Sequence, residues 1–263
     1  MDSMNLPVIL VFILSLFLLS GCAGDNPVSP VENGIETGRV IDVDNNEYKT
    51  VKIGEQWWMA ENLRVTRYQN GDEIHAGLNN NAWKNTTTGT FAVYPYESLE
   101  GINSSDEMLE LYGALYNWYA VNDERGLCPV GWRVPTDGEW KKLELYLGIS
   151  EQEVGKTGWR EKSEGGKLKS TRTAPGSHPK WNDPNLAATN ETGWSGLPGG
   201  YRDSGGDYSN IGIFGRWWSS SEHVPGDYYA VFRSLGTNYS TISRFVALKL
   251  HGFSVRCVKE SEI

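Results

Sequence analysis

The sequence is poor in the residues that build transition-metal sites. Its 263 residues include only 3 cysteines and 4 histidines. No C-x-x-C or H-x-x-x-H spacing occurs, although zinc and related metals are bound by such clusters. The histidines are scattered along the chain and are interpreted as solvated or hydrogen-bonded side chains: His75, His178, His223 and His251.

Positive charge is also scarce. The chain has 24 Lys and Arg residues against 33 Asp and Glu residues, a formal net charge of −9, and no run rich in Lys or Arg. Proteins that bind nucleic acid neutralise its phosphates with clustered basic side chains. We therefore expect no nucleic-acid partner.

Long apolar runs are absent apart from one near the start. Residues 6–19 are almost entirely apolar but too few to span a bilayer comfortably, so residues 1–21 are interpreted as a signal peptide. The run ends in Leu19-Ser20-Gly21-Cys22, which resembles the lipobox of bacterial lipoproteins, although no Lys or Arg precedes it. The resemblance implies a lipidated Cys22 that anchors the protein to a membrane of the bacterial envelope, at the outer membrane or cell surface rather than the inner membrane. An ordinary signal peptide cleaved elsewhere and a membrane helix are the alternatives.

A tether and one large domain are predicted after Cys22. Residues 22–36 are mostly polar and contain Pro27 and Pro30, so they are predicted to be flexible. Residues 37–263 form the domain. The composition, 39% hydrophobic with 30 glycines, 11 tryptophans and 13 tyrosines, favours a packed core of short strands joined by turns over a helical bundle.

Short strands are predicted in both halves of the domain. Alternating or β-branched runs bounded by turn residues place them at 40–43, 48–53, 56–59, 216–219, 228–232, 243–250 and 253–259. His251-Gly252 is predicted to join the last two as a hairpin turn. Trp57 and Trp58 point to opposite faces of their strand, so at most one enters the core easily, and both are interpreted as structural. Residues 66–104 and 170–190 are predicted to be irregular.

Two main helices are predicted. Apolar and aromatic side chains surround a helical wheel over residues 109–121. The second helix begins after Thr136, because Thr136 and Glu139 form a capping-box pattern, and it ends at Gly148. Short helical turns are expected near residues 150–153 and 165–169.

Six segments follow one another in an order that closely resembles a known family. They are NEYKTVKIGEQWWMAENL from Asn46, YGALYNWYAV from Tyr112, LCPVGWRVPTDGEW from Leu127, LPGGYRDSGG from Leu197, GRWWSSSE from Gly215 and GFSVRCVKE from Gly252. The family is the Fibrobacter succinogenes major paralogous domain of secreted and lipid-anchored bacterial proteins. The order of motifs also looks like the wider C-type-lectin-like superfamily, which includes formylglycine-generating enzymes. The resemblance implies an α+β fold of C-type-lectin-like type, with short antiparallel sheets, two main helices and long loops.

Two cysteines remain if Cys22 is lipidated. Outside the cytoplasm two cysteines in one domain are expected to pair, so a disulfide between Cys128 and Cys257 is predicted. Two buried thiols are the alternative. The oxidising enzymes of the superfamily look to bind copper through two closely spaced cysteines, and Cys128 and Cys257 do not form such a pair.

Catalytic patterns are weak. Residues 219–223, SSSEH, contain the residue types of a hydrolase triad, but neighbours along a strand do not thereby meet in space, and we interpret them as a strand ending in a polar turn. The glycine-rich residues 193–206 lack the phosphate-loop pattern and are interpreted as a tightly folded loop. We expect no enzyme.

A binding surface finds more support. Trp181-Asn182-Asp183 resembles the W-N-D stretch of calcium-dependent lectins, in which the asparagine and aspartate act as oxygen ligands, so calcium at Asn182 and Asp183 is the one cofactor considered. The partner motifs E-P-N and Q-P-D are missing. Further candidate residues in the neighbouring loops are Tyr201, Asp203, Asp207, Tyr208 and Glu222. Aromatic rings there are able to stack on a sugar or anchor a protein, and loop packing is the alternative.

The sequence therefore predicts a lipid-anchored envelope protein whose domain is a non-catalytic binding or adhesion module for a glycan or a protein. An enzyme related to formylglycine-generating enzymes and a purely structural envelope component are the alternative functions. A shallow aromatic groove would favour a glycan, and a deep pocket with perturbed titratable groups would favour an enzyme.

Overall fold

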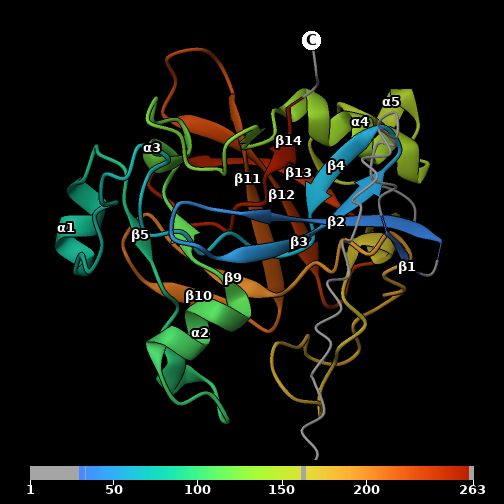
Figure 1. Cartoon of the computed structure of the whole chain (residues 1–263), viewed down its shortest axis with the longest axis horizontal. Coiled ribbons are helices and arrows are strands. Elements are labelled where there is room, and N and C mark those ends of the chain that lie inside the picture. The colour runs from blue at the N-terminus through green and yellow to red at the C-terminus, as the bar shows by residue number, and fades with distance from the viewer. Residues whose placement is uncertain (1–29, 33, 161–163, 261–263) are drawn as a thin grey trace, which may run out of the picture.

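The computed structural model describes residues 30–32, 34–160 and 164–260. It combines mostly antiparallel sheets with a few short helices, as the predicted α+β class requires (Figure 1). Cys22 and the signal peptide lie outside the described residues. No helix within the described ranges is long and apolar enough to cross a membrane. The helices are α1 (Asn80–Asn85), α2 (Ser105–Tyr112), α3 (Trp118–Val121), α4 (Asp137–Leu147) and α5 (Glu151–Val154), with 3-10 turns at Tyr96–Ser98 and Glu164–Leu168.

The first sheet joins the beginning of the domain to its end. It has 6 strands in the order β1-β2-β3-β4-β14-β7. The expected meander of three strands is present, and β14 pairs with both β4 and β7. Two strands begin inside the segment that was expected to be a tether, since β1 pairs with the start of β2. The strands are β1 (Val31–Glu32), β2 (Ile35–Ile41), β3 (Glu47–Ile53), β4 (Gln56–Met59), β7 (Trp132–Arg133) and β14 (Val258–Lys259).

The second sheet holds the long strands of the C-terminal half. Its 6 strands run in the order β10-β9-β11-β12-β13-β8, and only the β9–β11 pairing is parallel. A separate pair is formed by β5 (Phe91–Ala92) and β6 (Leu115–Tyr116). The strands of the second sheet are β8 (Gly158–Trp159), β9 (Gly199–Arg202), β10 (Tyr208–Ile211), β11 (Phe214–Glu222), β12 (Tyr229–Gly236) and β13 (Ser243–Leu248).

The predicted hairpin at His251-Gly252 is wrong. After β13 the chain makes single bridges from Gly252 to Arg202, from Phe253 to Tyr116 and from Ser254 to Trp217 before β14 joins the first sheet. The apolar alternation of the segment was correct, but its partners are three separate parts of the chain. Sequence pattern reports which side chains are buried, not which strand provides the backbone partners.

The predicted helix over residues 109–121 is also wrong. The chain forms α2, then β6, then α3, and α2 ends at Gly113 with φ +77°. A Cβ at Gly113 would lie 2.6 Å from the Cβ atom of Asn62. Only glycine therefore permits the close approach of this turn to the segment that contains Asn62. The side chains of residues 109–121 are mostly buried, as they would be in one helix, but tertiary packing divides the segment into α2, β6 and α3.

The helix predicted after Thr136 is confirmed as α4. The Thr136 side chain accepts a hydrogen bond from the Glu139 amide, the Glu139 carboxylate accepts one from the Thr136 amide, and Gly148 closes the helix in the left-handed conformation. The ring of Trp140 packs against Trp58 at 4.9 Å between centroids, which anchors α4 to the first sheet. In Figure 1 α4 and α5 lie near β4 and β14, away from α1 and α2.

The predicted disulfide between Cys128 and Cys257 is confirmed, with Cα atoms 6.0 Å apart. Both residues are buried in the core. The bridge ties the segment before α4 to the last strand, across 129 residues of chain.

Candidate functional site

The W-N-D stretch begins with a structural residue. The Trp181 side chain is fully buried, and its Nε1 atom donates a hydrogen bond to the Gly196 carbonyl at 2.9 Å. The backbone of Asn182 is bonded to Gly212, at the base of the β9–β10 hairpin, and the side chains of Asn182 and Asp183 face solvent.

The other candidate carboxylates lie elsewhere. Asp203 and Asp207 close the tip of the β9–β10 hairpin, where the Asp203 carboxylate accepts the amides of Gly205 and Asp207 at 2.8 and 2.9 Å. The base and the tip are separated by the 4 residues of each strand, or about 13 Å. Glu222 sits on β11 in an ion pair with Lys249.

The candidate carboxylates therefore occupy three separate places. Within the described part of the chain, no three His, Cys, Asp or Glu side chains are grouped to hold a metal ion.

The two candidate tyrosines contribute to packing. The guanidinium of Arg216 lies 3.8 Å from the ring centre of Tyr201, and Tyr201 also contacts Phe253 edge-on. Tyr208 packs edge-on against Tyr94 and beneath Arg202. Both rings are half-buried rather than presented to solvent.

The SSSEH segment does not form a catalytic triad. Ser219 donates its hydroxyl to the Val231 carbonyl at 3.0 Å, and the Ser221 hydroxyl accepts the amide of Asp137 at 2.9 Å. The exposed His223 bonds through its backbone to Tyr229. The segment is the end of strand β11, as predicted.

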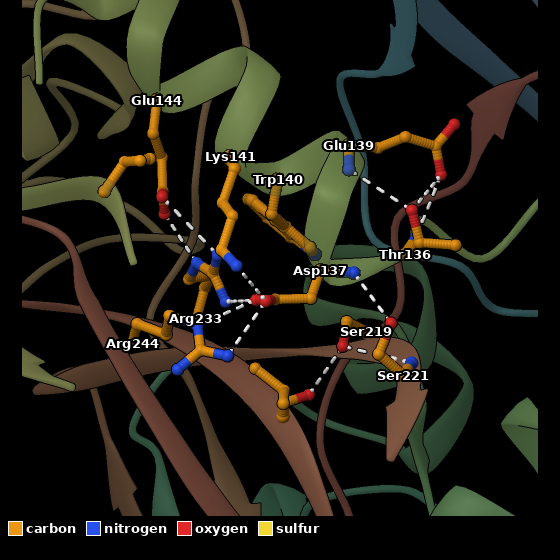
Figure 2. A network of polar contacts seen from close by, with 12 residues as sticks. Thr136, Asp137, Glu139, Trp140, Lys141, Glu144, Ser219, Ser221, Arg233 and Arg244 are labelled. Atoms are coloured by element: carbon orange, nitrogen blue, oxygen red, sulfur yellow. Dashed lines mark hydrogen bonds and ion pairs between the residues drawn. The ribbon is translucent and has the colours of Figure 1, made fainter. Parts of the chain in front are cut away.

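A buried ion network joins α4 to the second sheet (Figure 2). The carboxylates of Asp137 and Glu144 both point toward Arg233, which donates to them at 2.8 and 2.5 Å. Arg160 adds two bonds of 2.7 Å to Glu144, and Arg244 adds bonds of 2.9 and 2.8 Å to Asp137. The side chains of Glu144 and Arg233 are fully buried.

The network holds Asp137 in its charged form. Burial alone would raise the pKa of the Asp137 carboxyl, but the hydrogen bond from Arg244 and the charge of Arg233 outweigh it and hold that pKa well below its usual range. Every carboxylate oxygen accepts at least one hydrogen bond, so the network is a structural link between layers. The sequence marked Thr136 and Glu139 but not the three arginines, which come from β12, from β13 and from the residue that follows β8.

An open groove of about 920 Å³ lies between the β3–β4 turn, α4 and β14. Two aromatic side chains from different elements line it. Tyr146 on α4 is 65% exposed and covers Gly54, where a Cβ would lie 2.9 Å from the Cδ2 atom of Tyr146. Trp57 on β4 is half-buried and rests on Gly38.

Charged and apolar side chains complete this groove, called here the α4 groove. Leu145 is 39% exposed within it. Charges of both signs stand around the rings: Glu55, Lys142, Lys259 and Glu260. Such a surface offers flat apolar contact together with hydrogen-bond donors and acceptors. Sequence reasoning missed this groove, although the alternation of Trp57 and Trp58 was a signal that one ring leaves the core.

Comparison with known families identifies the domain. The sequence model of the Fibrobacter succinogenes major domain matches residues 51–259. The chain belongs to this family. Searches of curated proteins and of solved structures returned no match. Membership of the Fibrobacter succinogenes major domain family points to a domain of bacterial envelope type.

The motifs of this Fibrobacter succinogenes major domain mostly build its core. GRWWSSSE supplies the fully buried Trp217 and Trp218, and GFSVRCVKE supplies Cys257 and the fully buried Arg256. Arg256 donates to Asn62 at 2.8 Å and to the Ser195 carbonyl at 2.9 Å. The motif residues therefore specify packing of the core, so they identify the family but do not indicate which ligand the domain binds.

Proposed function

We propose that this domain is a non-catalytic binding module that holds a glycan in the α4 groove. The main observation behind this proposal is that the rings of Trp57, on β4, and Tyr146, on α4, line one open groove. Aromatic rings give a large and rigid apolar face, which matches the C–H face of a sugar ring. The charged groups around the rings supply partners for sugar hydroxyls.

The proposal includes the expected setting of the domain. The fold is of C-type-lectin-like type, and a lipid on Cys22 anchors the protein to the bacterial envelope. The family membership supports this setting, because the resemblance to this family implies a secreted or lipid-anchored bacterial protein. A purely structural role requires no ligand, so the open rings of the α4 groove favour binding.

The proposal also holds that the domain is not an enzyme. Several groups with perturbed pKa values are tied up in structural contacts. Burial lowers the pKa of Lys169 to about 8, but its amine donates to the carbonyls of Leu186, Gly236 and Tyr239. Burial lowers the pKa of Arg256 to about 9, and that side chain is held by the bonds described above. Both cysteine thiols of the domain are consumed by the disulfide.

Binding to immobilised oligosaccharides of glucose, N-acetylglucosamine and mannose tests the proposal. Tyr146→Ala and Trp57→Ala should each weaken binding by roughly 10-fold or more, as the removal of a central aromatic contact does. Tyr228→Ala is the matched control, because Tyr228 is 76% exposed on the β11–β12 turn, outside the groove. Sugar binding that both groove variants leave intact would contradict the proposal, and binding of a protein at the same rings would replace the glycan.

A further inference from the structure

A second groove adjoins the α4 groove at the β3–β4 turn. It has a volume of about 430 Å³ and lies between the start of β2, the end of β3, the C-terminal end of α4 and residues 191–192. It is called here the Lys52 groove. The two grooves share three lining residues, Ile53, Gly54 and Tyr146. They therefore form one continuous surface that passes the ring of Tyr146.

Strand register links the two grooves a second time. Trp57, which lines the α4 groove, is directly paired on the first sheet with Lys52, which lines the Lys52 groove. The register of β2 and β3 places Glu36 next in this row, and an ion pair of 2.9 Å joins Glu36 to Lys52. Directly paired side chains stand on the same face of a sheet, with Cβ atoms about 5 Å apart. The row from Trp57 to Glu36 thus crosses three strands over about 10 Å.

The ring of Tyr146 lies flat at the junction of the grooves. A Cβ at Gly54 would lie 2.9, 3.2 and 3.4 Å from the ring atoms Cδ2, Cγ and Cε2. Such similar distances to three consecutive atoms place that position over the face of the ring rather than at its edge. Gly54 has φ +60°, so a glycine both makes the turn and leaves room for the ring. One face of the ring therefore covers Gly54, and the other is open to solvent, in keeping with the 65% exposure of Tyr146.

The charged side chains of the Lys52 groove neutralise one another. Besides the pair of Glu36 and Lys52, Lys167 pairs with Glu191 at 3.2 Å and donates to the Leu147 carbonyl at 3.0 Å. All four charged side chains are partly exposed. An amine has three donors and a carboxylate has several acceptor positions, so each retains capacity for a ligand hydroxyl while its partner holds it in place. This arrangement suits a neutral ligand rich in hydroxyls.

We propose that the α4 groove and the Lys52 groove together bind one neutral, unbranched glycan chain along its length. The inference rests on the proposed function of the α4 groove and extends it from a sugar to several consecutive units. Units of the chain stack on Trp57 and on the open face of Tyr146. The units that follow exchange hydrogen bonds with the two ion pairs of the Lys52 groove.

Calorimetric titration with linear oligomers of glucose, N-acetylglucosamine and mannose, from the disaccharide to the hexasaccharide, tests the proposal. In a series that binds, the hexasaccharide should bind roughly 10- to 100-fold more tightly than the disaccharide, because it gains hydrogen bonds that are each worth several-fold in affinity. Hexamers of glucosamine and of galacturonate, which carry a charge on every unit, should both bind more weakly than the neutral hexasaccharide.

Two variants separate the grooves. Lys52→Met keeps an apolar stem but loses the amine, and Glu191→Ala removes a carboxylate, so each should weaken hexasaccharide binding by several-fold. Together they should remove the gain with chain length and leave disaccharide binding unchanged, which also reports that the variants are folded. Lys84→Met is the matched control, because Lys84 is exposed on α1, away from α4 in Figure 1, and it should leave both affinities unchanged.

The outcomes distinguish this inference from the proposed function. Equal affinity for the disaccharide and the hexasaccharide would overturn the extended site and leave the α4 groove as a short glycan site. A gain with chain length that the double variant preserves would also overturn it, since the longer chain would then lie elsewhere. Tighter binding of a charged hexamer would overturn the assignment to neutral glycans. Absence of binding in every series would overturn the extended site together with the proposed function.

Discussion

Replacing Glu144 by glutamine tests whether the buried ion network holds α4 to the second sheet. The substitution keeps the shape of the side chain and removes the charge shared by Arg160 and Arg233. Arg233 would still pair with Asp137, but Arg160 would be left with neutral acceptors, which are the glutamine oxygen and the carbonyls of Val154 and Ile242. A buried guanidinium would then lack a counter-ion.

The expected loss follows from this geometry. Breaking a buried ion pair by removing one partner costs about 3 to 5 kcal/mol in the free energy of unfolding. For a domain of this size that corresponds to a fall in melting temperature of about 6 to 20 °C. Urea and thermal unfolding followed by circular dichroism would measure both quantities.

Glu47→Gln is the matched control. Glu47 pairs with Arg39 at the surface, where the two side chains are 47% and 63% exposed, so the same chemical change should cost less than about 1 kcal/mol. Equal stability of the two variants would refute the reasoning that the network stabilises the fold.

Three further predictions concern conditions and cross-links. The pKa of Asp137 in the folded protein lies below its ordinary value of 3.8, so the stabilisation from its charged form is present at neutral pH and is lost as the pH falls below about 4. Asp137→Asn should therefore make the free energy of unfolding less dependent on pH in that range, as measured by acid unfolding. Replacing Cys128 and Cys257 together by alanine should lower the free energy of unfolding by about 3 to 5 kcal/mol, since the bridge closes a loop of 129 residues, and a loss below about 1 kcal/mol would contradict that account. The candidate carboxylates do not gather around Asn182 and Asp183, so the melting curves in excess calcium and in chelator should coincide, whereas a rise in melting temperature of about 5 to 10 °C in calcium would establish a site.

Local signals in the sequence predicted the parts of the fold that depend on neighbouring residues. The capping box of Thr136 and Glu139 and the stop at Gly148 determined α4, because caps and left-handed turns are set within a few positions. The meander of the first sheet followed from alternation and turn residues for the same reason. The disulfide followed from there being only two cysteines left to pair.

The predictions failed where a distant segment decided the outcome. Residues 109–121 have the side-chain pattern of a helix, but the contact of Gly113 with Asn62 divides them. His251-Gly252 has good turn chemistry, but Gly252 bridges to Arg202 and Phe253 bridges to Tyr116. The W-N-D stretch names suitable ligand types, and only the structure shows that the β9–β10 hairpin holds Asp203 and Asp207 at its far end; calcium binding at Asn182 and Asp183 stays a prediction.

The sequence by itself determined the family, the α+β class, the position of α4 and the pairing of the cysteines. Only the tertiary structure decided which polar groups are satisfied and which are left open. Glu144 and Arg216 are both charged residues in regular elements, and nothing in their neighbours along the chain separates them. Glu144 meets one arginine from β12 and one that follows β8, whereas Arg216 lies against aromatic rings and has no carboxylate partner among the described residues. That difference depends on which strands lie side by side, which is a property of the packed sheet rather than of any single segment.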